Sequence, residues 1–322
     1  MRILHRLLLL LMLVAPPTGS CAPEPRFACS GLVEYVVGDL PLILTAPHGG
    51  RLKPEHISNR TQGTLLADSH TDRLAREMAE AVRARTGRQP HLIICHLHRV
   101  KVDCNREITE GAQSNAAATA VWQAFHDFIA EARDAATRSN SAPALLLDLH
   151  GHAHPAPRVE LGYLLSRKQL ALPGAELEKL AAQSSIRQRA EIRRKNPVET
   201  GHAPSLREPT SFVDLLRGPH SLGGLLEHRG FAATPSPANP ASAGQEYFNG
   251  GYITRRYGSR DGGTLSAIQA ECPGKGFRTP EDQRRAFADA LAGALVEFLQ
   301  LPTNGDGATP PRPDGPGSGR LQ

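Results

Sequence analysis

The chain has 322 residues, and its 37 Lys and Arg against 32 Asp and Glu give a formal charge of +5. Hydrophobic residues make up 40% and charged residues 21%, a balance that excludes wholesale disorder and suits one large core. Aromatic residues make up only 5%, too few to favour a surface on which bases of nucleic acid stack. We expect a folded protein with no nucleic-acid partner.

Residues 1–22 are typical of a secretory signal. Arg2 and Arg6 precede the apolar run 7–15, and small residues follow it. The run is too short to cross a bilayer about 30 Å thick, so we expect no membrane span and a secreted or periplasmic protein. Cys21 leaves a lipid anchor open as an alternative. Without this segment the formal charge falls to +3, which does not favour a polyanionic partner.

Strands and helices alternate through the first half of the chain. The β-rich runs 32–37 and 40–45 predict a hairpin with its turn at Gly38 and Asp39. The next expected elements are a helix from Ser69 to about Thr86, a strand over 91–97, a helix over about 122–133 and a strand over 144–149. This alternation predicts an α/β fold: a single domain with a central mixed, largely parallel sheet flanked by helices.

The second half continues the pattern. The expected elements are a strand over 161–166, helices over about 175–194 and 211–229, and a strand over 265–272. A last helix is expected to have Thr279 as its N-cap and Pro280 at its first position. We predict one catalytic domain over 23–301 and a disordered, Pro- and Gly-rich tail over 302–322.

Four cysteines remain beyond the signal. In an oxidising compartment they could form two disulfides in any of three pairings, and the sequence leaves the pairing open. They are Cys29, Cys95, Cys104 and Cys272.

Three expected strands end near residues suited to metal chemistry, namely His48, His150 and Glu271. Ligands of open α/β sheets bind outside the carboxyl ends of the strands. A catalytic zinc site keeps three protein ligands and one open position, and it needs a further carboxylate as general base. His152 and His154 are alternative ligands, or else exposed loop residues. The sequence therefore predicts a metal site at this sheet edge.

Six short segments carry a further signal, because together they resemble the N-formylglutamate amidohydrolase family in composition and order. The resemblance reaches from about residue 40 to 300 and implies a zinc-carboxypeptidase-like fold and one zinc ion. The segments are Ala46–Gly50, Asp68–Leu74, Arg99–Arg106, Asp148–Gly151, Gly250–Gly258 and Ala267–Glu271.

The resemblance implies a role for each matched residue. His48 and His150 would bind zinc as neutral imidazoles, with Asp68 as the third ligand. Glu55 is the alternative third ligand, and Asp68 could instead cap the following helix. Glu271 would be the general base for a metal-activated water. Alternatively, Glu271 is a buried structural carboxylate that pairs with an arginine.

Arginine suits a substrate carboxylate because its planar guanidinium donates two parallel hydrogen bonds. The resemblance implies Arg106 as a catalytic group that polarises the scissile carbonyl. A structural network of ion pairs is the alternative explanation of these residues. The residues expected to bind substrate are Arg99, Asp103, Asn105, Asn249 and Arg255.

These features predict a zinc-dependent amidohydrolase that cleaves a linear amide bond in N-formylglutamate, another N-acyl amino acid or a short peptide. The family acts in intracellular histidine breakdown, whereas this chain carries an export signal, so the substrate stays open. The alternative is a non-catalytic secreted binding module for carboxylate-bearing amino acids or peptides. The oligomeric state is not predicted.

Overall fold

The computed structural model describes residues 23–138, 143–195, 211–242, 244 and 246–304. The expected signal, and the tail beyond residue 304, lie outside the described residues. The strands are β1 (Arg26–Ala28), β2 (Val33–Val36), β3 (Leu42–Ala46), β4 (His91–Cys95), β5 (Ala144–His152), β6 (Val159–Gly162), β7 (Ala233–Thr234) and β8 (Leu265–Pro273).

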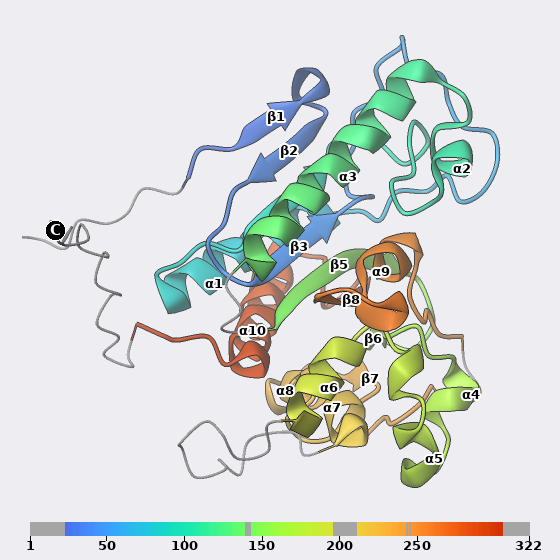
Figure 1. Cartoon of the computed structure of the whole chain (residues 1–322). Coiled ribbons are helices and arrows are strands. Elements are labelled where there is room, and N and C mark those ends of the chain that lie inside the picture. Colours follow the sequence, from blue (N-terminus) through green and yellow to red (C-terminus); the bar gives the residue numbers. More distant parts are fainter. Residues whose placement is uncertain (1–22, 139–142, 196–210, 243, 245, 305–322) are drawn as a thin grey trace, which may run out of the picture.

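The helices connect and cover these strands (Figure 1). None of those in the described part of the chain is long and apolar enough to cross a membrane. The helices are α1 (Thr71–Thr86), α2 (Ile108–Ala112), α3 (Ala116–Thr137), α4 (Arg167–Leu170), α5 (Gly174–Glu178), α6 (Arg187–Lys195), α7 (Phe212–Arg217), α8 (Leu222–His228), α9 (Tyr252–Tyr257) and α10 (Glu281–Leu299).

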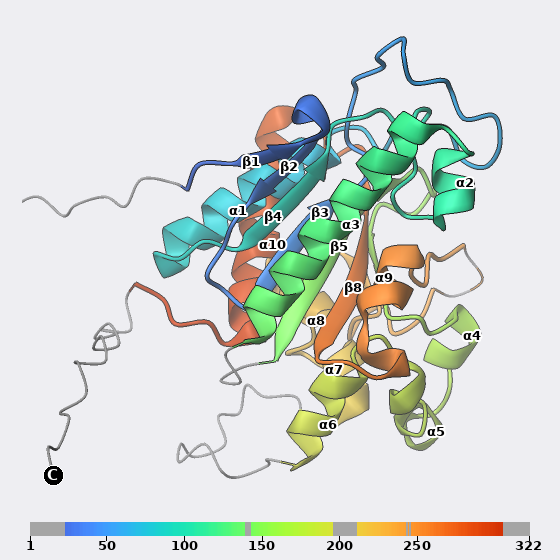
Figure 2. The ribbon, with the colours of Figure 1, turned by 45° about the horizontal axis from the view of Figure 1, so that its top comes forward.

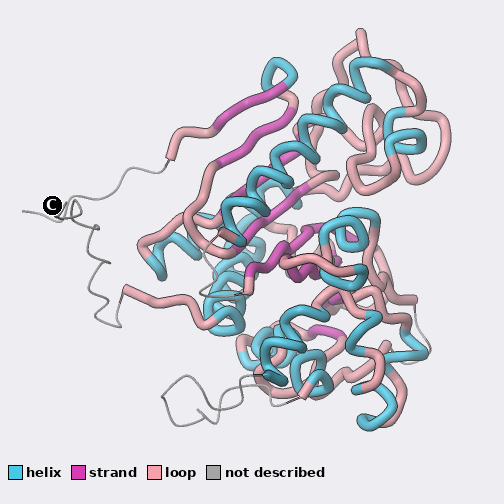
Figure 3. The backbone as a smooth tube through the Cα atoms, viewed as in Figure 1, coloured by secondary structure: helices cyan, strands magenta, loops and turns pink. Residues whose placement is uncertain are grey.

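All eight strands form one sheet in the order β1-β2-β4-β3-β5-β8-β6-β7. Its centre is parallel, because β3 pairs in parallel with β4 and β5, and β5 with β8. Antiparallel pairs join β2 to β4 and β6 to β8. The expected mixed, largely parallel sheet is confirmed. Figure 3 shows long loops around α2.

Apolar side chains on both faces of the central strands pack against helices. Leu42 and Leu44 of β3 belong to a core shared with α1 and α10, whereas Ile43 belongs to a core shared with α3 and α9. Figure 2 shows these helix pairs on opposite sides of the sheet. An ion pair of 2.8 Å between Arg284 and Glu77 also joins α10 to α1. The carboxyl ends of β3, β5 and β8 are therefore fixed from both sides.

The predicted hairpin over 32–45 is wrong, because β4 lies between β2 and β3. The backbone N–H groups of Asp39 and Leu40 donate to the carbonyl of Gln89 at 2.9 and 3.1 Å. The segment at Gly38 and Asp39 therefore bonds to the loop before β4, and the two strands that it connects, β2 and β3, do not pair with each other.

Two expected long helices are broken. The region 175–194 holds α5, a short 3₁₀ turn and α6, and the region 211–229 divides into α7 and α8 around Gly218 and Pro219. Proline cannot donate a helical hydrogen bond, which explains the second break. The N-cap of α10 is Pro280, with extended backbone (ψ −175°), one residue later than expected.

The four cysteines, whose pairing the sequence left open, are free thiols in the structure. Burial raises the pKa of the Cys104 thiol well above its usual value, and the neighbouring Cys95 raises it further.

Candidate metal centre

The sheet brings the three strand-end residues together at one edge. His48 follows β3 by two residues, and in the parallel pair β5–β8 His150 stands directly opposite Glu271. All three side chains are buried. Because β3, β5 and β8 are neighbours, their carboxyl ends open onto one space, as expected for an open α/β sheet.

Asp68 joins the two histidines in a compact triangle. His48 Nδ1 lies 3.1 Å from His150 Nδ1 and 3.3 Å from Asp68 Oδ2. His150 Nδ1 lies 3.1 Å from the same oxygen. Around a tetrahedral zinc ion with bonds of about 2.0–2.1 Å, ligand atoms stand about 3.3 Å apart. The three side chains therefore have the spacing that a zinc ion requires.

The ring protons of the histidines point away from this triangle. His48 Nε2 donates to Asp103 Oδ1 at 2.7 Å, and His150 Nε2 donates to Asp148 Oδ2 at 2.7 Å. A carboxylate only accepts, so each Nε2 carries a proton, and with a metal bound each neutral ring would offer its Nδ1 lone pair to the ion. The two Nδ1 atoms and the Asp68 oxygen would then converge on one cation.

The two carboxylates behind the histidines are themselves fixed. Asp103 accepts from the backbone N–H of Asn105 and from Arg99 Nε, each at 2.9 Å. Asp148 accepts from the Thr45 hydroxyl at 2.7 Å. Such outer partners set the orientation and the basicity of metal ligands.

The carboxylate of Asp68 is available to the two histidines because the first turn of α1 bonds to the backbone carbonyl of Asp68 and not to its side chain. Its carbonyl accepts from the N–H and the hydroxyl of Thr71 at 3.2 and 2.9 Å, and the N-cap residue His70 makes no side-chain capping bond. The helix-cap alternative for Asp68 is therefore wrong. Glu55 is exposed and is not part of the triangle, so the geometry favours Asp68 as the third ligand.

The buried histidines and carboxylates of the site shift one another's pKa values. Burial raises the pKa of Asp68, but the two histidines outweigh it and hold the pKa well below its usual range. Burial lowers the pKa of His150, yet Asp148 and Asp68 together hold it well above its usual value. Burial also raises the pKa of Glu271 to about 7, and its hydrogen-bond partner is Gln269 Nε2 at 2.9 Å, not an arginine.

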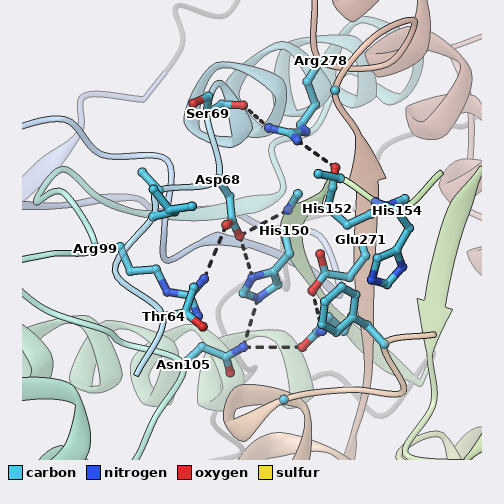
Figure 4. Close-up of a pocket in the computed structure, with 18 of the residues that line it drawn as sticks. Thr64, Asp68, Ser69, Arg99, Asn105, His150, His152, His154, Glu271 and Arg278 are labelled. Atoms are coloured by element: carbon cyan, nitrogen blue, oxygen red, sulfur yellow. Dashed lines mark hydrogen bonds and ion pairs between the residues drawn. The ribbon is translucent and has the colours of Figure 1, made fainter. Parts of the chain in front are cut away.

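A cavity of about 570 Å³ opens beside the triangle, a size suited to a small molecule. Figure 4 shows Asp68, His150 and Glu271 turned toward this space. The sequence-predicted residues that line it are Asp68, Arg99, Asn105, Arg106, His150 and Glu271.

Three residues expected to bind substrate do not line the cavity. Asp103 is fully buried behind His48, where it holds the ring. Arg255 is exposed in the last turn of α9, and Asn249 is exposed in the preceding loop, where its carbonyl accepts from Leu164 N at 2.6 Å. The cavity wall therefore does not include these three residues, and their substrate-binding roles stay predictions.

Sequence reasoning missed Gln269 and Arg278 in the cavity wall. Gln269 could have been found, because it is two residues before Glu271 on the same strand face. Arg278 had no sequence signal, since the turn after β8 folds it back toward the site. Its guanidinium donates to the carbonyls of Ser69 and His152, which ties the Asp68 loop to the end of β5 (Figure 4).

Gly151→Ala tests the contact that holds Arg278. An added Cβ would lie 2.4 Å from the Arg278 guanidinium carbon, and that group cannot move without losing its bonds to carbonyls. We expect a loss of about 1–3 kcal/mol in the free energy of unfolding, measured by urea denaturation. Gly174→Ala is the matched control, because nothing lies within 4 Å of its added Cβ, and an equal loss there would contradict the argument.

His152 and His154 form a second group with Glu160, separate from the triangle. His152 is already satisfied by backbone: its Nδ1 accepts from His154 N and its Nε2 donates to Arg158 O, each at 3.0 Å. His154 lies between Glu160 (2.8 Å) and Glu246 (3.2 Å). Neither histidine belongs to the triangle, so the geometry favours His48 and His150 as ligands.

Asp103→Asn tests the outer support of His48. The amide keeps the shape of the side chain but removes the charge that fixes the ring, so we expect zinc affinity to fall about 10–100-fold in equilibrium dialysis. Asp39→Asn, at an exposed residue paired with Arg88, is the control and should leave the affinity unchanged. Equal affinity in both variants would contradict the assigned role of Asp103.

The fold and the site together define an α/β protein with a candidate metal centre at the carboxyl edge of its parallel strands. No family model matches the chain, and no curated protein matches it either. Among solved structures it is similar to the crystal structure of N-formylglutamate amidohydrolase from Ralstonia eutropha JMP134, with a TM-score of 0.46 and 16% identity, covering 84% of this chain and 96% of that chain.

Two further solved structures are similar. A gene product from Agrobacterium tumefaciens has a TM-score of 0.44 and 14% identity, covering 82% of this chain and 91% of that one. A candidate metallopeptidase from Shewanella amazonensis SB2B has a TM-score of 0.32 and 13% identity, covering 83% and 81%. All three TM-scores lie below 0.5, so we infer the function from the residues of the site alone.

Proposed function

We propose that this protein is a zinc-dependent amidohydrolase that cleaves an N-formylglutamate-like N-acyl amino acid or a short peptide. One observation carries the proposal: three acceptor atoms of His48, Asp68 and His150, spaced 3.1–3.3 Å apart, converge beside a cavity that also holds Glu271. A zinc ion held by these residues would lower the pKa of a water molecule and polarise the scissile carbonyl.

The chain supplies the remaining groups of an amide hydrolysis. Glu271, with its pKa raised by burial to about 7, accepts a proton from the attacking water and delivers it to the leaving nitrogen. Arg106 is exposed at the cavity and stabilises the developing oxyanion. Arg99 and Asn105, also in the wall, bind the polar groups of the substrate.

Metal removal tests this function. The full chain is treated with a chelator and assayed on N-formyl-L-glutamate, N-acetyl amino acids and dipeptides, then titrated with zinc. We expect hydrolysis to disappear and to return with one equivalent of zinc. Hydrolysis that survives complete metal removal would contradict the proposal, and zinc binding without hydrolysis of any of these amides would favour the non-catalytic binding module.

We also propose that the protein is exported, on the basis of residues 1–22. Expression of the full chain in its own cells should yield a shortened protein in the periplasm or the medium. Full-length protein confined to the cytoplasm would contradict export without affecting the proposed chemistry.

A further inference from the structure

Two large apolar side chains at the cavity are open to solvent. Phe248 is 43% exposed and Leu66 is 79% exposed, and both line the cavity that holds Glu271. Single exposed apolar residues are common on protein surfaces, but these two line a cavity and so offer apolar surface to a ligand in it.

The ring of Phe248 is held in place by a buried carboxylate. His154 stacks on Phe248 with ring centres 4.7 Å apart and planes at 7°. Glu160, which is fully buried on β6, holds both partners: its Oε1 lies 2.8 Å from His154 Nδ1, and its Oε2 accepts from the N–H of Phe248 at 2.8 Å. We call these three residues the Phe248 platform.

This arrangement is more than core packing. A buried carboxylate is costly unless it is hydrogen-bonded, and both oxygens of Glu160 are used to fix Phe248 and its stacking partner. A ring needed only to fill the core would be buried, whereas nearly half of this one is exposed, at the cavity. Glu160 also stands opposite Glu271 in the β6–β8 pair, so the platform is built on the strand next to the expected general base.

We propose that the Phe248 platform is a subsite for an apolar, preferably aromatic, group of the amide substrate. The proposal rests on the proposed function and narrows its substrate class: one side of the scissile amide carries an apolar group that stacks on Phe248, in the offset or edge-on geometry that aromatic pairs favour. The apolar group belongs either to the amino acid or to the acyl part of the substrate, and in both cases it would stack on Phe248 in the same way.

Four small amides test the subsite on the zinc-loaded full chain. N-formylglycine has no apolar group, N-formyl-L-phenylalanine carries one on the amine side, N-phenylacetylglycine carries one on the acyl side, and N-formyl-L-glutamate carries a charge. We expect kcat/KM for at least one phenyl compound to exceed that for N-formylglycine by about tenfold or more. Phe248→Ala should reduce this ratio about tenfold, mainly through KM, while Phe248→Tyr keeps it.

Phe27→Ala removes another exposed phenylalanine ring, from β1 and outside the cavity, and should leave the ratio unchanged. A ratio that Phe248→Ala does not change, or a wild-type preference for N-formyl-L-glutamate alone, would overturn the subsite and leave the proposed function intact. If no compound is hydrolysed, the proposed function fails, and calorimetric binding of the same four compounds then decides the subsite: a preference for phenyl compounds lost in Phe248→Ala supports it, and its absence overturns it.

Discussion

Glu271→Gln is expected to lower kcat for amide hydrolysis by about 10²–10⁴-fold while one zinc ion stays bound to each chain. The amide has nearly the shape of the carboxyl group but cannot accept the proton of the attacking water. Glu271 is not one of the three triangle residues, so zinc affinity should not fall. Steady-state kinetics together with metal analysis of the same sample would measure both effects.

The fold should tolerate this substitution. Burial already raises the pKa of Glu271 to about 7, and a neutral amide avoids the cost of burying a charge. Glu55→Gln is the matched control, since Glu55 is exposed in a loop outside the cavity. Hydrolysis that persists at the wild-type rate in Glu271→Gln would remove the assigned base while leaving the metal assignment standing.

Asp68→Asn is expected to weaken zinc binding by more than about 100-fold, because even outer partners of metal ligands contribute 10–100-fold. The substitution removes the anionic member of the triangle and leaves two neutral histidines facing an amide. Hydrolysis should fall with the bound metal and recover in part at high zinc concentration. Equilibrium dialysis against a competing chelator measures the affinity.

The rival ligand provides the control for this experiment. Glu55→Gln should bind zinc like the unmodified chain, because Glu55 is exposed and not part of the triangle. If Glu55→Gln loses the metal and Asp68→Asn retains it, the third ligand has been assigned to the wrong carboxylate. Circular dichroism of each variant separates lost metal from lost fold.

The sequence could predict the centre of the site because strand ends are readable from the chain alone. His48, His150 and Glu271 each follow or end an apolar run, and parallel strands place such residues at one edge. The family resemblance added Asp68, which no periodicity indicates. The third ligand comes from a loop between β3 and α1 whose path depends on tertiary contacts, such as the bond from Asp68 N to His48 O at 3.0 Å.

Other features depend on pairing between distant segments. Nothing local to 32–45 shows that β4 will insert between β2 and β3. Likewise, Asp103 lies between Arg99 and Asn105, which both line the cavity. Only the fold shows that the Asp103 side chain bonds to the His48 ring instead of lining the cavity. The break at Gly218 and Pro219, in contrast, was readable from the sequence, because this pair disfavours a continuous helix.

The most direct test of the account is the position of zinc in crystals of the zinc-loaded protein, located by anomalous diffraction at the zinc edge. We expect one peak at about 2.0–2.2 Å from the Nδ1 atoms of His48 and His150 and a carboxylate oxygen of Asp68. The absence of zinc at this position, or a single ion held instead by His152, His154 and Glu160, would contradict the central claim.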